Sequence, residues 1–247
     1  MLDCLRDQNI PYHIITVTDG AIEGKIPEIA GPVIFYGSLV GRQVCERYGW
    51  TPGVWNNPEY FSERKLIDAI GPLALNYDAQ TVPFRDAVKT AKTMDWDPFF
   101  IKPNSDVKEF AGMIQTQEDF NEWYMKMMTI GYFHEGIEDR PVVISSPKIL
   151  GKEWRLVVLE QKVIAYSIYR QFQKVIPKRD CPAEVIALAE QVVAGFNPAP
   201  VFVVDICETI NGLRVVELNG FNSAGLYKCD VTAIIPAVTE FVERTWQ

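Results

Sequence analysis

The sequence predicts an α+β fold, in which strands follow one another along the chain and helices lie between only some of them. Two observations lead to this prediction. Three strand-like runs, 141–145, 154–159 and 162–169, follow one another without a helical segment between them. Two further runs, 201–207 and 213–218, form a second pair. A repeating βαβ barrel would alternate strand and helix throughout, so the order of the elements favours α+β.

Helices are predicted from the spacing of apolar residues and from capping signals. Residues 182–194 have apolar positions at helical spacing and are followed by Gly195, a typical helix stop. Ser62 is suited to cap a helix that ends before Gly71. Further helices are expected over 39–48, 117–129 and 231–243, and further strands over 12–17, 32–36 and 99–102.

A domain boundary is predicted near residue 95. The stretch from Asp95 to Pro98 combines two acids, a tryptophan and a proline directly before an abruptly apolar strand. We therefore expect a small α/β domain over residues 1–95 and a core over residues 96–247.

Composition excludes several classes of protein. The net charge of −8 and the pI near 4.9 do not favour nucleic-acid backbones or anionic lipid, so no nucleic-acid partner is expected. No apolar run reaches the roughly 18 residues that a membrane span needs, and the first residues do not form a secretory signal. We expect no membrane partner and a cytoplasmic location.

Cysteine and histidine usage argues against two kinds of chemistry. The five cysteines are scattered, odd in number and without a C-x-x-C pair, so neither a disulfide framework nor a zinc site is indicated. Only two histidines are present, which gives little support for a Ser-His-Asp triad.

Acidic residues interrupt two strands that are otherwise apolar on both faces. Asp205 lies within the run 201–207, and Glu217 lies near the end of 213–218. Burying an unpaired carboxylate costs several kcal/mol, so a cation is expected beside them. The alternative is a solvent-facing edge hairpin with incidental acids, and periodicity alone leaves both interpretations open.

The register of this hairpin decides which side chains share a face. A two-residue turn at 211–212 sends Asp205 and Glu217 to opposite faces. A three-residue loop at 210–212, whose final glycine takes the left-handed conformation of a bulge, places them directly opposite one another with Asn219 on the same face. The second register gathers two carboxylates and an amide oxygen, which are ligands suited to Mg²⁺.

At this point the sequence resembles the ATP-grasp superfamily. In those enzymes one late strand supplies an Asp and the next supplies Glu-x-Asn to hold the Mg²⁺ ions of Mg-ATP, a pattern that Asp205 and Glu217-Leu218-Asn219 match. The strand 99–103 resembles the one that carries a lysine toward the ATP phosphates, which implies that role for Lys102. Residues 104–112 stand in the place of the phosphate-covering loop. Taken alone, Lys102 would be interpreted as an ordinary edge lysine.

The next segment resembles the connector whose main chain binds the adenine. By this likeness the nucleotide contacts fall at Ser145, Ser146 and Lys148. The following Gly151-Lys152-Glu153-Trp154-Arg155 resembles the signature that opens the next strand of the family.

This signature implies three further roles. Glu153 would accept hydrogen bonds from the ribose hydroxyls, and Arg155 would face the phosphates. Arg170 resembles an arginine that steadies the transferred phosphoryl group. Each charge alone would be interpreted as a solvated surface residue, and it is their order along the chain that favours the site.

The resemblance implies an ATP-grasp fold, two α+β subdomains gripping ATP, preceded by a small α/β domain. It also implies ATP and Mg²⁺ as cofactors and an ATP-dependent carboxylate-amine ligase that acts through an acyl phosphate. Its partners would be small-molecule or peptide carboxylates and amines. A small-molecule kinase of the same fold and a non-catalytic nucleotide-binding module stay open. Within the superfamily the chain looks closest to uncharacterised ATP-grasp domain proteins of bacteria and phages, a likeness that names no substrate.

Overall fold

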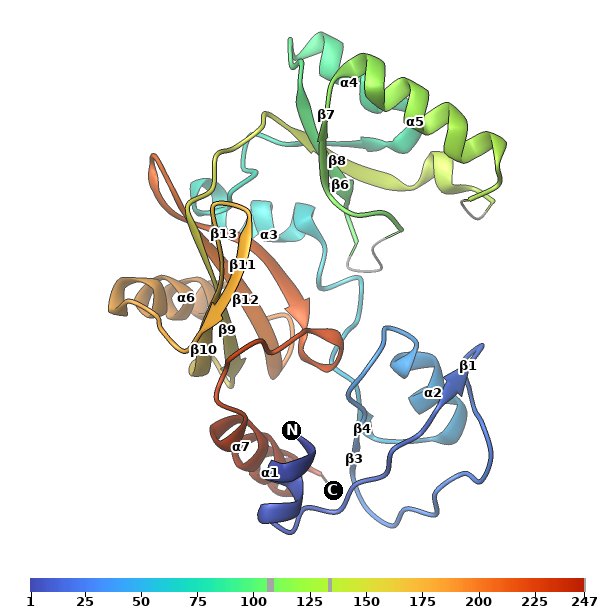
Figure 1. Cartoon of the computed structure of the whole chain (residues 1–247), viewed down its shortest axis with the longest axis vertical. Coiled ribbons are helices and arrows are strands. Elements are labelled where there is room, and N and C mark those ends of the chain that lie inside the picture. Colours follow the sequence, from blue (N-terminus) through green and yellow to red (C-terminus); the bar gives the residue numbers. More distant parts are fainter. Residues whose placement is uncertain (106–108, 133–134, 247) are drawn as a thin grey trace. The chain divides into compact units, whose positions relative to one another are not determined.

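The structure, a computed structural model, describes residues 1–105, 109–132 and 135–246. The chain forms two compact units, and the first is assembled from both ends of the sequence. Unit 1 comprises Met1–Asn57 and Leu150–Gln247, and unit 2 comprises Pro58–Ile149. Figure 1 shows the elements of each unit. No helix within the described ranges has both the length and the apolar character that crossing a membrane requires.

Unit 1 is built on a five-stranded antiparallel sheet in the order β11-β10-β9-β12-β13. Its strands are β9 (Lys152–Leu159), β10 (Lys162–Gln171), β11 (Lys174–Lys178), β12 (Val201–Thr209) and β13 (Gly212–Gly220). Along β12, residues 201–207 are all buried, although successive side chains point to opposite faces. The strand is therefore covered on both sides, which explains its continuous apolar sequence.

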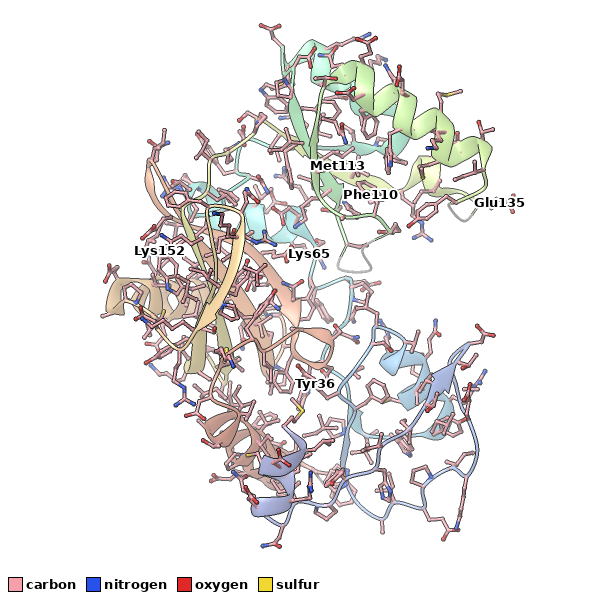
Figure 2. All side chains as sticks on the ribbon, in the orientation of Figure 1. Tyr36, Lys65, Phe110, Met113, Glu135 and Lys152 are labelled. Atoms are coloured by element: carbon pink, nitrogen blue, oxygen red, sulfur yellow. The ribbon has the colours of Figure 1, made fainter. Side chains whose placement is uncertain are left out.

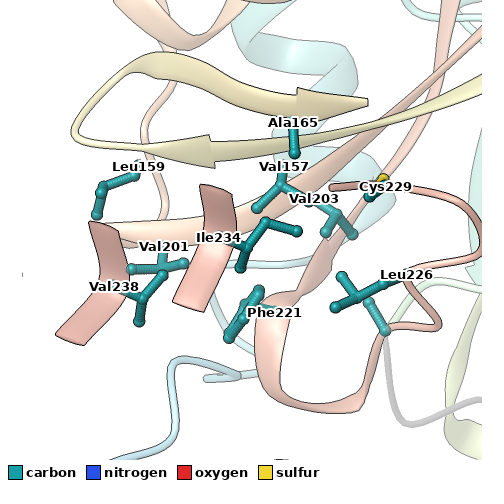
Figure 3. Packing of buried hydrophobic residues seen from close by; sticks show 11 residues of the cluster. Val157, Leu159, Ala165, Val201, Val203, Phe221, Leu226, Cys229, Ile234 and Val238 are labelled. Atoms are coloured by element: carbon teal, nitrogen blue, oxygen red, sulfur yellow. The ribbon is translucent and has the colours of Figure 1, made fainter. Parts of the chain in front are cut away.

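Two long helices pack on this sheet. They are α6 (Ala183–Gly195) and α7 (Val231–Thr245). Ile234 and Val238 of α7 lie in one buried cluster with Val157, Val201 and Val203 of the sheet, as Figure 3 shows. This cluster occupies one end of a sheet face and leaves the other end of β9 and β12 for polar side chains.

The N-terminal part of unit 1 consists of short elements. They are α1 (Leu2–Asp7), β1 (Val17–Thr18), β2 (Ala21–Ile22), β3 (Val33–Ile34), α2 (Gly41–Tyr48) and β4 (Pro52–Gly53). Strand β3 pairs in parallel with β4, and α2 forms the crossover between them. Gly49, which ends α2, has a φ of 66°, a left-handed conformation that glycine adopts without steric cost.

One buried asparagine ties this N-terminal part to the end of β13. Asn222, in the short 3₁₀ turn η4 (Phe221–Ser223), accepts a hydrogen bond from Trp55 N through Oδ1 at 2.6 Å. Its Nδ2 donates to Phe35 O at 2.6 Å and to Gly53 O at 3.3 Å. The hydroxyl of Tyr36, labelled in Figure 2, donates to Ala224 O. The segment after β13 is therefore held by residues more than 160 positions away.

Unit 2 is built on a four-stranded antiparallel sheet in the order β5-β8-β6-β7. The strands are β5 (Gln80–Pro83), β6 (Phe99–Pro103), β7 (Met113–Gln115) and β8 (Pro141–Ser145). The helices are α3 (Glu63–Ile70), α4 (Ala87–Thr93) and α5 (Gln117–Thr129), with 3₁₀ turns η1 (Gly71–Leu73), η2 (Phe84–Asp86) and η3 (Ile137–Asp139). Phe84, Phe99 and Phe120 form an aromatic core between the sheet and the helices.

Most predicted elements are confirmed. Helix α5 and strand β8 have the predicted bounds, and Ser62 caps α3 by accepting a hydrogen bond from Lys65 N. The N-terminal strands are shorter than expected, because 12–17 and 32–36 contribute only two paired residues each. Strands β5, β7 and β11 and helix α4 are additional. They are short, so their sequences carry too few residues to reveal a period.

The division into units differs from the boundary expected after residue 95. The stretch from Asp95 to Pro98 joins α4 to β6 inside unit 2, and Trp96 packs against the aromatic core of that unit. Strand β5, which precedes this stretch, pairs with β8, which follows it. The acidic, proline-containing sequence therefore marks a connection within a unit.

We predict that Asn222→Ala destabilises unit 1 by about 3 kcal/mol, because it leaves the buried groups at Phe35, Gly53 and Trp55 without their side-chain partner. Urea unfolding followed by tryptophan fluorescence measures the loss. The exposed Asn197 provides the control, since Asn197→Ala should change the stability by less than about 0.5 kcal/mol. Equal stability of the two variants would contradict the proposed clamp.

Candidate functional site

The two acids of the late hairpin lie directly opposite one another. Asp205 on β12 pairs with Glu217 on β13, and Val203 pairs with Asn219. Because alternate residues of a strand share a face, Asp205, Glu217 and Asn219 project from the same side of the sheet. The predicted grouping of these three side chains is therefore confirmed.

The cause of this register differs from the predicted one. Thr209 pairs with Gly212, so the turn contains two residues, and the extra residue is Val216, at a bulge between the pairs Ile206–Val215 and Asp205–Glu217. Without this bulge Asp205 would lie opposite Val216, and Glu217 would project to the other face. Gly212 does take a positive φ, of 90°, but it is paired in the ladder.

The interpretation as a solvent-facing edge hairpin is wrong for Asp205. This residue is 1% exposed on a strand with neighbours on both sides, and Asn219 is 3% exposed. Asn219 Nδ2 donates to Glu217 Oε1 at 3.0 Å. The amide of Asn219 is thereby oriented beside the carboxylate of Glu217.

A buried arginine holds Asp205. On β9, which neighbours β12, Arg155 pairs with Asp205, and its guanidinium donates Nε to Oδ1 at 2.8 Å and Nη2 to Oδ2 at 2.6 Å. Its Nη1 donates to Gly225 O at 2.9 Å. Burial lowers the pKa of Arg155, but the Asp205 carboxylate more than reverses this and raises the pKa above the ordinary value. The pair is bidentate and stays ionised.

Two tyrosines cover this guanidinium. Tyr169 and Tyr227 stack with ring centroids 4.8 Å apart, and the guanidinium carbon of Arg155 lies 5.6 Å and 5.2 Å from their centroids. Tyr227 has a φ of 50°, a left-handed conformation that is uncommon for a bulky residue and marks local strain. The aromatic contacts offset this strain and exclude water from the ion pair.

A second bulge gathers side chains around Glu153. On β10 the register shifts between Ile168 and Arg170, so Tyr169 is the extra residue and both it and Arg170 reach Glu153 on β9. The Tyr169 hydroxyl donates to Glu153 Oε2 at 2.9 Å, and Arg170 Nη1 lies 3.6 Å from Oε1. Burial raises the pKa of Glu153, and the contacts with Tyr169 and Arg170 only partly oppose this rise.

Glu153 is 2% exposed, so its carboxylate lies inside unit 1. Within the described part of the chain, neither Glu153 Oε1 nor Arg170 Nε has a hydrogen-bond partner. The ribose contact of Glu153 and the phosphoryl contact of Arg170 stay predictions. The structure places these residues next to Arg155 and Asp205, in the same sheet.

The predicted nucleotide residues of unit 2 lie on β6 and just after β8. Lys102 is in the β6 strand and donates to Glu63 Oε2 of α3 at 3.0 Å. Ser145 ends β8 and is fully buried, while Ser146 and Lys148 follow it. The predicted phosphate-covering loop 104–112 includes residues 106–108, which lie outside the described residues.

An aspartate orders the segment after β8. Lys148 Nζ donates to both carboxylate oxygens of Asp78, at 2.8 Å and 3.0 Å, and to Ser146 O at 2.7 Å. The Ser146 hydroxyl donates to Asp78 Oδ2 at 2.6 Å. Burial raises the pKa of Asp78, but the hydrogen bonds from Lys148 and Ser146 outweigh it and hold the pKa below its ordinary value.

Sequence reasoning missed Glu63, Asn76, Asp78 and Tyr227. Three of these are acids or amides in stretches that looked like helix start or loop, and their partners lie 13 to 70 residues away. No periodic pattern connects residues at such separations. Only Tyr227, in the loop after Glu217-Leu218-Asn219, stood near a motif that was recognised.

The donor set fits a hard divalent cation. A carboxylate has about four lone-pair sites, so the two bonds from Arg155 do not exhaust the acceptor capacity of Asp205. Asn219, whose amide nitrogen donates to Glu217, keeps its amide oxygen as a donor for a metal. No group of three or more His, Cys, Asp or Glu able to hold a metal occurs among the described residues, so the proposed set depends on the amide oxygen of Asn219.

Arg155→Met should destabilise the protein by about 3–5 kcal/mol, because it leaves the carboxylate of Asp205 buried without a cation. The double variant Arg155→Met/Asp205→Asn should recover part of this loss, since the remaining amide is neutral. Arg244→Met, which breaks the exposed pair with Glu160, is the control and should cost at most about 1 kcal/mol. Urea unfolding of the four proteins checks the order, and a double variant less stable than Arg155→Met would contradict it.

Solved structures share this fold at low sequence identity. D-alanine–D-alanine ligase from Bacillus anthracis matches with a TM-score of 0.58 and 14% identity, over 84% of this chain and 76% of that chain. The ATP-grasp ligase PsnB, complexed with minimal precursor, Mg and ADP, matches with a TM-score of 0.50 and 16% identity, over 83% and 66%. At these identities the likeness shows the fold alone.

The chain is shorter than several of the proteins it resembles. An ATP-grasp protein with a RimK domain from Sphaerobacter thermophilus DSM 20745 matches with a TM-score of 0.48 and 16% identity, over 74% of this chain and 63% of that one. The chain thus spans slightly less than two thirds of this protein and of PsnB. No curated protein sequence matches the chain.

The family match covers most of the chain. Residues 46–238 match a family of ATP-grasp domains that is the third family of its clade. This span includes strands β9, β12 and β13 with the buried Arg155–Asp205 pair, and strand β6 with Lys102. The chain therefore belongs to this family of ATP-grasp domains.

Proposed function

We propose that this protein is an ATP-dependent carboxylate-amine ligase that acts through an acyl phosphate. The observation that carries the proposal is the common face of Asp205, Glu217 and Asn219 in a chain that belongs to the ATP-grasp family. The fold relatives include a protein named as a D-alanine–D-alanine ligase and one named as an ATP-grasp ligase, which supports ligation.

Unit 1 would hold the metal. Asp205, Glu217 and Asn219 are hard oxygen donors suited to Mg²⁺, and Arg155 keeps Asp205 ionised and oriented. Bound Mg²⁺ would neutralise charge on the ATP phosphates. Arg155 and Arg170 would offset further negative charge on the phosphoryl group as it transfers.

Unit 2 would hold the nucleotide through β6 and the segment after β8. Lys102 would contact the phosphates, and the main chain at Ser145, Ser146 and Lys148 would contact the adenine. The hydrogen bonds of Asp78 to Ser146 and Lys148 keep this segment in one conformation. A fixed main chain can present its donors and acceptors to the base without an ordering cost on binding.

The reaction would proceed in two steps. A carboxylate oxygen of the first substrate attacks the γ-phosphorus, a new O–P bond forms, and ADP leaves with the electrons of the broken bond. The amine of the second substrate then attacks the acyl carbon, phosphate leaves, and the amine loses a proton as the amide forms. Neither step needs a protein nucleophile.

The cysteines agree with this scheme. Burial raises the pKa of the thiol to about 11 for Cys45 and to about 12 for Cys181, Cys207 and Cys229. These thiols are therefore protonated near neutral pH and are poor nucleophiles. Covalent catalysis by these four cysteines is not supported.

The substrates belong to the classes that the relatives' names suggest. One relative is named for joining two D-alanines, and the other is complexed with a precursor. We propose a small-molecule or peptide carboxylate and an amine as the substrates. The use of ATP favours a cytoplasmic location.

Incubation of the protein with Mg-ATP and a pool of amino acids and short peptides tests the reaction class. Amine-dependent release of phosphate together with a new amide mass supports the ligase. A stable phosphorylated product would replace the ligase with a kinase of the same fold. Absence of ATP binding would exclude both and leave a non-nucleotide role.

Asp205→Asn and Glu217→Gln should each lower Mg-dependent turnover at least about a hundredfold, because each removes an anionic metal ligand. Turnover and Mg²⁺ affinity are measured in the same preparations after folding is checked by circular dichroism. Glu208→Gln on the same hairpin is the matched control and should stay near wild-type activity, since Glu208 pairs with Lys152. Full activity in either ligand variant would refute the metal assignment.

Lys102→Ala should weaken binding of a non-hydrolysable ATP analogue by about tenfold or more, because a charge-assisted contact to phosphate is lost. Isothermal titration calorimetry measures the affinity. Lys65→Ala is the control, since Lys65 is exposed on α3 of the same unit, as labelled in Figure 2. An unchanged affinity in Lys102→Ala would count against the phosphate role.

A further inference from the structure

We propose that Glu63 is a positioning residue that fixes the ammonium group of Lys102 for the nucleotide phosphates. We further propose that Asn76 and Ser145 extend this contact into a hydrogen-bonded line that reaches the segment after β8. The inference rests on the proposed function, because that function gives Lys102 its phosphate role. All the residues of the line belong to unit 2.

Glu63 is a buried carboxylate with a partner on each oxygen. It is 4% exposed, although it stands in the first turn of a helix. Oε2 accepts from Lys102 Nζ at 3.0 Å, and Oε1 accepts from Asn76 Nδ2 at 3.0 Å. A buried carboxylate is costly unless both oxygens are satisfied, so this arrangement depends on both partners.

The position of Glu63 is set by the backbone at the start of α3. Ser62 caps the helix, and the first free amides of the helix are satisfied by one residue, Asn104. Glu63 N donates to Asn104 O at 2.9 Å, and Arg64 N donates to Asn104 Oδ1 at 2.9 Å. Asn104 lies two residues beyond Lys102, so the helix start is tied to the same chain segment as the lysine.

The line continues across the β6–β8 ladder. Asn76, 3% exposed, donates to Glu63 and accepts at Oδ1 from Ser145 Oγ at 3.2 Å. Ser145 pairs with Phe100, two residues before Lys102 on β6. Glu63 requires a donor from Asn76 and Ser145 supplies one, so the amide of Asn76 has a single favourable orientation.

Beyond Ser145 the line meets the ordered segment that Asp78 holds. Ser146 O accepts from Lys148 Nζ at 2.7 Å, and Asp78 binds both residues. The proposed phosphate lysine and the proposed adenine-contacting main chain are thereby connected by buried polar contacts. A shift at one end would cost hydrogen bonds at the other, so the two contacts to the nucleotide are held at a constant spacing.

Anchoring matters because lysine is flexible. Its side chain carries about 2 kcal/mol of rotamer entropy, which would oppose phosphate binding if it had to be lost at that stage. An ammonium has three donors, so the bond to Glu63 is compatible with a bond to a phosphate oxygen. The carboxylate also favours the charged form of the lysine.

A double-mutant cycle on the full chain tests the proposal. The variants are Glu63→Gln, Lys102→Met and the pair, and the readout is the dissociation constant of a non-hydrolysable ATP analogue with Mg²⁺. Glutamine has one carbonyl oxygen and cannot accept from both Lys102 and Asn76, so Glu63→Gln should weaken binding by about tenfold. In the Lys102→Met background the same change should have no further effect on the affinity, because Glu63 acts through Lys102.

The pH dependence of analogue binding supplies a readout that a purely structural role would not move. Without the Glu63 carboxylate the ammonium of Lys102 loses a stabilising anion, so its pKa falls. The affinity of Glu63→Gln should therefore decline at a lower alkaline pH than that of the wild type. Glu118→Gln, at an exposed position on α5 of the same unit, is the matched control and should bind as the wild type does.

The outcomes separate this inference from the proposed function. If Lys102→Met leaves analogue binding unchanged, the phosphate role of Lys102 fails and the inference fails with it. If Lys102→Met weakens binding but folded Glu63→Gln does not, or if the two effects add, only the positioning role is overturned. Should Glu63→Gln not fold, Asn76→Ala replaces it in the cycle. It removes one of the two anchors of Glu63 and should weaken binding in the same direction, by a few-fold, with unchanged affinity again overturning the role.

Discussion

The bidentate pair between Arg155 and Asp205 is the interaction on which the proposed chemistry of unit 1 depends. A carboxylate in the centre of a sheet covered on both faces would be protonated or would disrupt the fold if no cation balanced it. Arg155 supplies that charge from the neighbouring strand, and the rings of Tyr169 and Tyr227 shield the pair. The protein can therefore keep an ionised acid inside an apolar sheet, which is the requirement for holding a metal away from bulk water.

Two single-residue bulges convert an ordinary antiparallel sheet into a site. The one at Val216 turns Glu217 and Asn219 toward Asp205, and the one at Tyr169 lets Tyr169 and Arg170 both approach Glu153. Each bulge lies on an outer neighbour of the central pair β9 and β12, which stays regular. A regular central ladder with irregular flanking strands keeps the fold stable while it aims side chains.

The sequence was sufficient for features that depend on local pattern. Acids within apolar strands identified Asp205 and Glu217, and the stretch 99–103 identified β6 with Lys102. The grouping of the metal candidates was predicted for the wrong reason, since a bulge at Val216 leaves no signal in a run of valines. Glu63, Asn76 and Asp78 were missed because their roles arise from contacts between elements far apart in the chain. The expected boundary near residue 95 failed to match the two units for a similar reason, because β5 before it pairs with β8 after it.

The clamp formed by Asn222 has a consequence for the order in which the polypeptide folds during translation. Residues 58–149 are contiguous, so their unit can be completed while the ribosome is still adding the rest. The first 57 residues have no such option, because the asparagine that satisfies Phe35, Gly53 and Trp55 is made about 170 residues later. Until then this nascent segment waits with exposed backbone groups and aromatic side chains, which makes it the part of the chain with most need of a chaperone.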